Sequence, residues 1–153
     1  MDDRTIVICY DGSLAAQAAI ERVAELWPGG LVTILTAWQP IEAYALARLA
    51  SIGSIDDIDR SITQAAQELA DEGVQRAREA GLVATGTTTP AGARVGHALL
   101  EWCDAEGADL IVVGASGDSA LSDAMTGSVA AHVMHHTATP VLLVHRKRAA
   151  PAT

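Results

Sequence analysis

Three glycines and a serine, between an apolar run and a helical segment, have a spacing that suits phosphate binding. Gly114, Gly117, Gly127 and Ser128 form the pattern G-x2-G-x9-G-S. Glycine lets the backbone approach a ligand closely, and the N-terminus of a helix presents unpaired N–H groups to anions. A plain strand-to-helix loop would also use glycine, but this spacing is a specific one. The chemistry that these residues could perform is the binding of a nucleotide through its phosphates.

A second polar group, Asp11-Gly12-Ser13, ends another apolar run near the N-terminus. Asp11 could form an Asx turn, and Asp11 or Ser13 could cap the helix that follows. Open parallel sheets bind ligands beyond the carboxyl ends of their strands, at the point where the strand order reverses. In the order 3-2-1-4-5 that point lies between the first and fourth strands, so the two polar groups are predicted to meet in one crevice.

Short apolar runs alternate with segments of helical periodicity along the chain. We predict strands over 5–10, 31–38, 82–89, 108–113 and 140–145, and helices over 14–27, 61–80, 94–106 and 128–137. Residues 41–59 are predicted to form a loop with at most a helical turn. The alternation predicts an α/β fold, a doubly wound open five-stranded parallel sheet of strand order 3-2-1-4-5 with helices on both faces. Residues 1–148 would form one domain and residues 149–153 a flexible tail.

Composition argues against several classes of function. The chain has 153 residues, half of them apolar, and a formal net charge of -9. A negative chain argues against nucleic acid binding, and the basic run 145–148 is interpreted as a solvated end of the last strand. We find neither a signal-peptide pattern nor an apolar run of membrane length, so we expect a soluble, cytoplasmic protein without membrane contact. Cys9 and Cys103 are predicted to be buried, reduced thiols.

Taken together, these motifs resemble the universal stress protein family over essentially the whole chain. The nucleotide loop of that family is G-x2-G-x9-G-[ST] after the fourth strand, and the glycine loop of this chain matches it in full. Segment 7–13 resembles the family's first strand and V-D-G-S turn, and segments 108–114 and 139–144 resemble its fourth and fifth strands. The resemblance implies a stress-response regulatory protein that binds an adenine nucleotide, with ATP as the first candidate.

The resemblance also implies roles for individual residues. Asp11 would accept hydrogen bonds from ribose or adenine, and Ala37 and Trp38 would contact the base, mainly through their backbone. Gly114 and Gly117 would let the loop curl under the α-phosphate. Gly127 and Ser128 would meet the outer phosphates at the start of the last helix, through backbone N–H groups and the Ser128 hydroxyl. The implied nucleotide-binding residues are Asp11, Gly12, Ser13, Ala37, Trp38, Gly114, Ala115, Gly117, Gly127, Ser128 and Val129.

The loop departs from the family pattern in its charge. Members that bind ATP commonly carry Arg, Lys or His near the second glycine, where this chain has Ser116, Asp118, Ser122 and Asp123. Two like charges about 4 Å apart repel by roughly 1 kcal/mol in bulk water and by about 4 kcal/mol at an effective dielectric near 20. Three outcomes are open. The acids point outward, Mg²⁺ bridges them to phosphate, or the ligand is less charged, such as AMP or cyclic AMP.

The last strand carries Val141, Leu142, Leu143 and Val144 and lies at an edge of the predicted sheet. Such an apolar strand is poorly suited to an open, unpaired edge. In similar proteins it pairs with its twofold mate, so the resemblance implies a homodimer through these residues.

The sequence leaves three functions to compare: a nucleotide-binding regulatory module, a slow ATPase or self-phosphorylating protein, and a stress-linked dimer that binds no nucleotide and acts by protein contact. We favour the first, with a protein partner that the sequence does not identify. We find no general base, Walker lysine or arginine finger, so no catalytic residue is predicted. His132, His135 and His136 have a spacing that could hold a metal, but a solvated helix end explains them as well.

Overall fold

The computed structural model describes residues 3–40, 55–115 and 128–146. Helices and strands alternate along these residues as the sequence predicts. In chain order the elements are β1 (Ile6–Cys9), α1 (Leu14–Leu26), β2 (Leu31–Trp38), α3 (Ile55–Glu79), β3 (Val83–Pro90), α4 (Val95–Ala105), β4 (Leu110–Gly114), α5 (Ser128–His136) and β5 (Val141–Val144).

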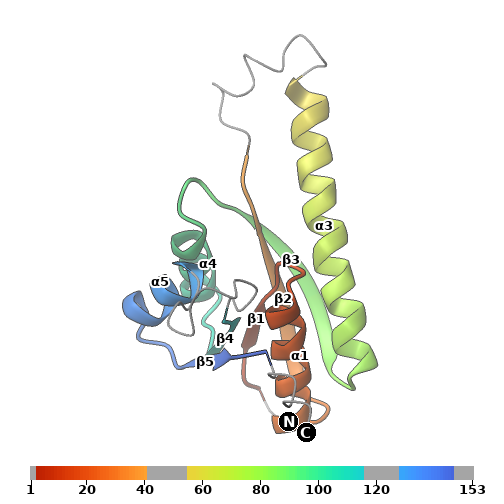
Figure 1. The fold of residues 1–153 in the computed structure, drawn as a ribbon, viewed down its shortest axis with the longest axis vertical. Helices are drawn as coiled ribbons and strands as arrows, with labels where there is room; N and C mark the ends of the chain where they lie inside the picture. The colour runs from red at the N-terminus through yellow and green to blue at the C-terminus, as the bar shows by residue number, and fades with distance from the viewer. Residues whose placement is uncertain (1–2, 41–54, 116–127, 147–153) are drawn as a thin grey trace, which may run out of the picture.

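The strands form one parallel sheet in the order β3-β2-β1-β4-β5, which confirms the predicted topology. The central strand, β1, pairs on one side with β2 and on the other with β4, so that Ile6 lies opposite both Val32 and Leu110. Figure 1 shows α1 and α3 on one side of this sheet and α4 and α5 on the other. The strand order reverses between β1 and β4, where a ligand of such a sheet is expected to bind.

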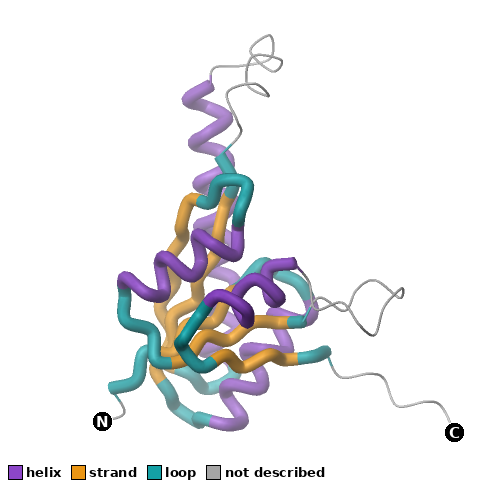
Figure 2. Tube along the Cα trace, turned by 90° about the vertical axis from the view of Figure 1, so that its left-hand side faces the viewer, coloured by secondary structure: helices purple, strands orange, loops and turns teal. Residues whose placement is uncertain are grey.

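Each face of the sheet carries its own apolar core, because successive strand residues point to opposite faces. Ile6 and Ile8 of β1 pack with α1 and α3, whereas Val7 packs with α4 and α5. Burial on both faces explains why the strands read as continuous apolar runs. Figure 2 shows the layered arrangement from the side, with the strands between helices.

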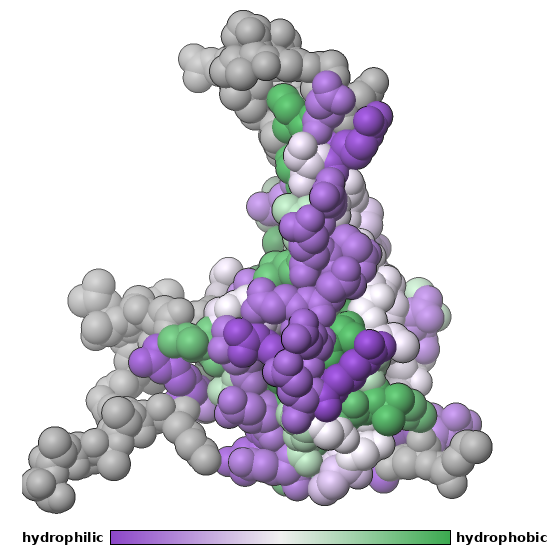
Figure 3. Space-filling model, turned by 90° about the vertical axis from the view of Figure 1, so that its right-hand side faces the viewer, coloured by the Kyte–Doolittle hydropathy of each residue, from purple (hydrophilic) through white to green (hydrophobic). Residues whose placement is uncertain are grey.

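Helix α3 begins at Ile55, so the prediction of a loop up to Asp59 is wrong for its last five residues. Aspartates are frequent over residues 55–59, as they are in loops. Carboxylates in a first turn, however, also stabilise the N-terminus of a helix through its dipole. Residues 41–54 lie outside the described part of the chain. The first half of α3, yellow in Figure 1, extends beyond the sheet. The hydrophilic outer face of this helix forms the purple band in Figure 3.

Most other boundaries differ from the predictions by one or two residues. Gly81 and Gly107 follow α3 and α4 in the left-handed conformation that commonly ends helices, with φ of 95° and 66°. Cys103 is buried as expected, but Cys9 is only half-buried, which corrects that prediction. Within the described ranges, we find no helix that combines the length and the apolar character needed to cross a membrane.

Candidate functional site

The carboxyl ends of β1 and β4 border a cavity of about 320 Å³. This is the switch point of the sheet, and the volume lies at the lower end of the range that small-molecule sites occupy, roughly 300–1,000 Å³. Its walls come from both strand ends, from β2, and from the first turns of α1, α4 and α5. The lining residues are Cys9, Tyr10, Asp11, Ser13, Ala15, Ala16, Leu35, Ala37, Val95, Leu99, Val113, Gly114, Ser128, Val129 and Ala130.

Six of the residues singled out from the sequence meet in this cavity: Asp11, Ser13, Ala37, Gly114, Ser128 and Val129. The two polar groups that lie far apart in the sequence are therefore brought together. Gly117 and Gly127, with the acids Asp118 and Asp123, lie outside the described residues. The flanking residues of the glycine loop are placed at the cavity, but its middle stays a prediction.

Three further predicted residues have other surroundings. The carbonyl of Trp38 accepts a hydrogen bond from the N–H of Ala91 at 2.7 Å. Ala115 is buried, and its N–H donates to the carbonyl of Val144 at 2.8 Å, which extends the pairing of β4 with β5. Gly12 is the turn residue, with φ of 79°, a conformation that favours glycine. None of these three contributes to the lining of the cavity.

The turn after β1 holds Asp11 through local hydrogen bonds. The carboxylate of Asp11 accepts the N–H of Ser13 at 2.9 Å, which is an Asx turn, and the hydroxyl of Ser13 accepts the N–H of Ala16 at 3.1 Å, which caps α1. Gln17 donates from Nε2 to the carbonyl of Gly12 at 3.2 Å. Both local roles considered from the sequence are thus present. The second carboxylate oxygen of Asp11, an exposed residue, has no partner among the described residues.

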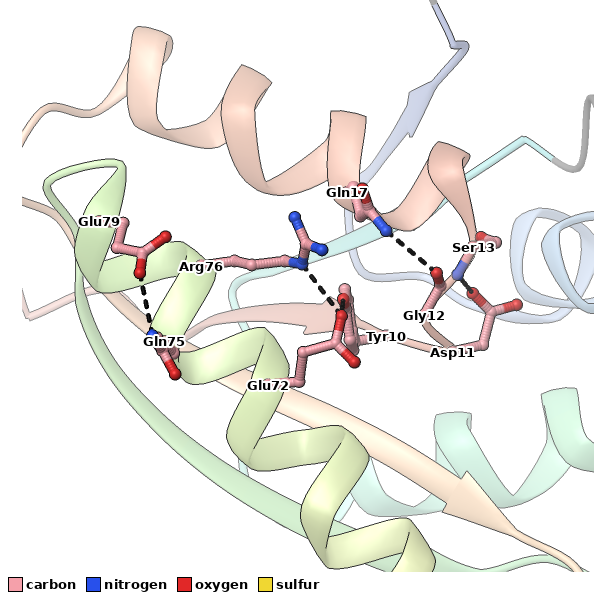
Figure 4. Close-up of polar contacts among 9 residues, drawn as sticks. All are labelled: Tyr10, Asp11, Gly12, Ser13, Gln17, Glu72, Gln75, Arg76 and Glu79. Carbon is pink, nitrogen blue, oxygen red and sulfur yellow. Dashed lines mark hydrogen bonds and ion pairs between the residues drawn. The ribbon is translucent and has the colours of Figure 1, made fainter.

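The strand end before this turn is fixed by Tyr10. Its N–H donates to the carbonyl of Leu35 at 2.9 Å, and its own carbonyl accepts the hydroxyl of Thr36 at 2.9 Å. Its phenol donates to Oε1 of Glu72 on α3 at 2.9 Å, and the same oxygen accepts Nε of Arg76 at 3.0 Å (Figure 4). Burial, together with the hydrogen bond to Glu72, raises the pKa of Tyr10 to about 12. The hydrogen bonds from Arg76 and then Tyr10 lower the pKa of Glu72.

Apolar side chains line much of the cavity, and the sequence did not single them out. Leu35, Val95, Leu99 and Val113 belong to the core on the α4 and α5 side. Cys9 joins them, and burial, followed by the nearby Cys103 and Asp11, raises the pKa of its thiol. A neutral thiol behaves as a small apolar group. Only the end of this core that lies at the switch point borders the cavity, and the spacing of the apolar residues in the sequence does not mark that end.

The N-termini of α1 and α5 both border this cavity. Ser128 is the first residue of α5, and Val129 and Ala130 continue its first turn. Ala15 and Ala16 lie in the first turn of α1. The first N–H groups of a helix lack partners within it and carry a partial positive charge. The cavity therefore combines apolar walls, one carboxylate and helix ends suited to an anion.

Two of the three histidines of α5, His132 and His136, stack on each other. The rings of His132 and His136 are parallel, with centroids 4.1 Å apart, and the ring of His97 on α4 meets His132 edge-on at 6.4 Å. In the part of the chain that the structure describes, no three side chains of His, Cys, Asp or Glu are placed to hold a metal ion.

Comparison with known proteins agrees with this architecture. A model of the universal stress protein family matches residues 4–145. The universal stress protein Rv1636 of Mycobacterium tuberculosis is 31% identical over 142 residues, which cover 93% of this chain and 96% of that protein. A solved universal stress protein in complex with cAMP is 28% identical, with a TM-score of 0.67 over 94% of this chain and 98% of the other. The structure of protein MJ0577 has a TM-score of 0.73 at 20% identity, over 95% and 98% of the two chains. With its fold, its strand-end motifs and these relatives, the chain belongs to the universal stress protein family.

Proposed function

We propose that this chain binds an adenine nucleotide in the cavity between β1 and β4 and acts as a homodimeric, cytoplasmic stress-response regulator. The observation that carries the proposal is the meeting of Asp11 and the N-terminus of α5 in one apolar cavity. A nucleotide needs these three environments together: an apolar slot for the base, an acceptor for ribose hydroxyls and a donor-rich end for phosphate.

Each part of the nucleotide has a matching part of the cavity. The adenine would lie against Leu35, Ala37 and Leu99, which lie on the apolar side of the cavity. The free oxygen of Asp11 would accept a ribose hydroxyl, since the other oxygen is engaged by Ser13. The phosphate would meet the first turn of α5 at Ser128 and the glycine loop before it.

The number of phosphates is the finer part of the proposal. The family pattern of the loop favours ATP, whereas the relative that was solved with cAMP favours a ligand with one phosphate. Asp11 is the one charged residue among the described lining residues. The loop itself adds Asp118 and Asp123 rather than basic residues. ATP with Mg²⁺ is the first ligand to test, and AMP and cyclic AMP are the alternatives.

Titration calorimetry with ATP, AMP and cyclic AMP, each with and without Mg²⁺, tests the ligand directly. We expect binding of at least one of them, with GTP as the control for the base. If none of the three nucleotides binds at millimolar concentration, the remaining function is that of a dimer that acts by protein contact. Gly117→Val should abolish binding because the second glycine of the loop pattern would let the backbone approach a phosphate, while the mass of the assembly stays unchanged.

Asp118→Arg tests whether the acids of the loop limit the phosphate count. If Asp118 faces the phosphates, the substitution should strengthen the binding of ATP more than that of AMP, since ATP carries more negative charge. Equal affinity for ATP in the variant and the wild type would mean that this carboxylate points away. A rate of phosphate release above the buffer control would instead favour the slow ATPase.

The homodimer is proposed through β5, the edge strand opposite to β3. Val141, Leu142 and Leu143 are only half-buried within one chain, and among the described residues their strand pairs with β4 alone. Sedimentation equilibrium should therefore give about twice the chain mass of 15.8 kDa. A monomer mass at every protein concentration would refute this part of the proposal.

A further inference from the structure

Helix α3 contributes no residue to the cavity, yet it contacts the residues on both sides of Asp11 in the sequence. The phenol of Tyr10 reaches α3 and donates to Glu72 at 2.9 Å, as Figure 4 shows. On the other side of Asp11, a Cβ at Gly12 would stand 3.0 Å from Cδ1 of Leu69. The turn that carries the Asp11 carboxylate is therefore packed against α3, a helix that does not line the cavity.

The approach of α3 is close because Gly73 has no side chain. A Cβ at this position would lie 2.9 Å from Cδ1 of Tyr10 and 2.8 Å from Cγ2 of Ile34. The Tyr10 residue is 2% exposed, so its ring is clamped between the helix and the strands. Its hydroxyl reaches the edge of this packing, where the Glu72 side chain is 46% exposed and is paired with Arg76.

The position of the free Asp11 oxygen depends on this support. Ser13 already takes one carboxylate oxygen, and Gln17 takes the carbonyl of Gly12, so the turn is closed by its own bonds. Tyr10, the residue before the turn, is bonded to β2 through its main chain and to α3 through its hydroxyl. The apparent affinity of a protein for its ligand falls in proportion to the fraction of molecules in the binding-competent conformation.

We propose that Tyr10 and Glu72 are positioning residues for Asp11, and that α3 thereby sets the affinity of the cavity for a nucleotide ribose. The hydrogen bond between them holds the strand end in the register in which the free oxygen of Asp11 faces the cavity. Arg76 completes the arrangement by offsetting the charge of Glu72. This inference rests on the proposed function, since it concerns the same cavity and its ligand.

Tyr10→Phe tests the inference with little change in packing, because only the hydroxyl is removed. Calorimetric titration with AMP should show a Kd raised about three- to tenfold, the range expected for one coupled polar contact. The loss should disappear in the Asp11→Ala background, where no carboxylate remains to be positioned. If Tyr10→Phe weakens binding by the same factor with and without Asp11, the inference is overturned.

Variants of Glu72 provide a second test of the same inference. Glu72→Ala should match Tyr10→Phe, whereas Glu72→Gln keeps an oxygen that accepts from the phenol and should restore most of the affinity. The matched control is Gln75→Ala, which removes a bond of 3.0 Å to Glu79 on the same helix without touching β1. Circular dichroism confirms that each variant is folded.

The outcomes separate this inference from the proposed function. If the wild type binds none of the three adenine nucleotides, both fail. If the wild type binds AMP and Asp11→Ala weakens it, but Tyr10→Phe and Glu72→Ala bind as the wild type does, the cavity function stands and the positioning role is overturned.

Discussion

The Cα of Gly114, at the end of β4, lies directly against the main chain of Ala15 in the first turn of α1. A Cβ at position 114 would stand 2.5 Å from the carbonyl carbon of Ala15 and 2.7 Å from its oxygen. Close packing against α1 therefore explains why the first position of the phosphate-loop pattern is a glycine. The close approach brings the N-terminus of α1 to the cavity that β4 also borders.

Gly114→Ala should therefore destabilise the fold, because main-chain atoms cannot move aside as a flexible side chain can. Overpacking of this kind costs about 1–3 kcal/mol. Urea denaturation measures it as a lower midpoint at an unchanged slope. The control is Gly92→Ala, since a Cβ there meets nothing within 4 Å. Equal midpoints for the two variants would contradict a packing role for Gly114.

Ser13→Ala should cost about 1 kcal/mol, because its hydroxyl accepts the N–H of Ala16 at the start of α1. The same residue lines the cavity, so the substitution should also weaken nucleotide binding. Thermal unfolding and titration report the two effects separately. Ser13→Thr keeps an oxygen for the cap and should recover most of the stability; a Ser13→Ala variant as stable as the wild type would exclude the capping role.

Thr36→Val should cost about 1–3 kcal/mol, the penalty for a buried polar group that loses its partner. Thr36 is 2% exposed, and its hydroxyl donates to the carbonyl of Tyr10. Valine has nearly the same shape, so the loss would reflect the hydrogen bond rather than a cavity. Thr33→Val, at a half-buried position of the same strand, is the matched control and should stay within about 0.5 kcal/mol. Similar unfolding free energies for the two variants would refute the expectation.

The topology could be predicted because local residues, mainly glycine and proline, mark where its helices and strands begin and end. Strand β2 has the predicted bounds, since Pro28, Gly29 and Gly30 precede it and Pro40 follows it closely. Asp11 and Ser128 could be placed at one site because parallel strands put their carboxyl ends at one edge. The start of α3 was missed because its acids are typical of loops as well as of first turns.

The support behind the site could not be predicted from spacing. Tyr10 and Glu72 are separated by 62 positions in the sequence, and their contact depends on how α3 crosses the strands. The signal that was present is the tyrosine itself, because a phenol at the end of a buried strand needs a partner for its hydroxyl. Gly73 gives a second signal, as a glycine inside a helix pattern often marks close packing.

The stability of the fold should fall as the pH is lowered through the region below about 6.5, because of the histidine stack. Desolvation, followed by the neighbouring His136, His97 and Arg94, holds the pKa of His132 below its usual value. The unfolded chain then binds the proton more readily than the folded one, so protonation favours unfolding. His132 lies where α5 approaches Gly96 closely, with 2.9 Å between its Cβ and a Cβ placed at that glycine.

His132→Gln removes this titration and should flatten the pH dependence of the urea midpoint in the region below about pH 6.5. The other titratable or charged side chains near His132 are Arg94, His97, His136 and Glu101, whose Oε1 lies 3.4 Å from Nε2 of His97. His135→Gln, which removes a histidine of the same helix outside the stack, is the control and should keep the wild-type slope. An unchanged slope in His132→Gln would contradict a difference in the pKa of His132 between the folded and unfolded states. Because Ser128 at the other end of α5 lines the cavity, the same series measured with AMP tests whether acid loosens the phosphate end of the site.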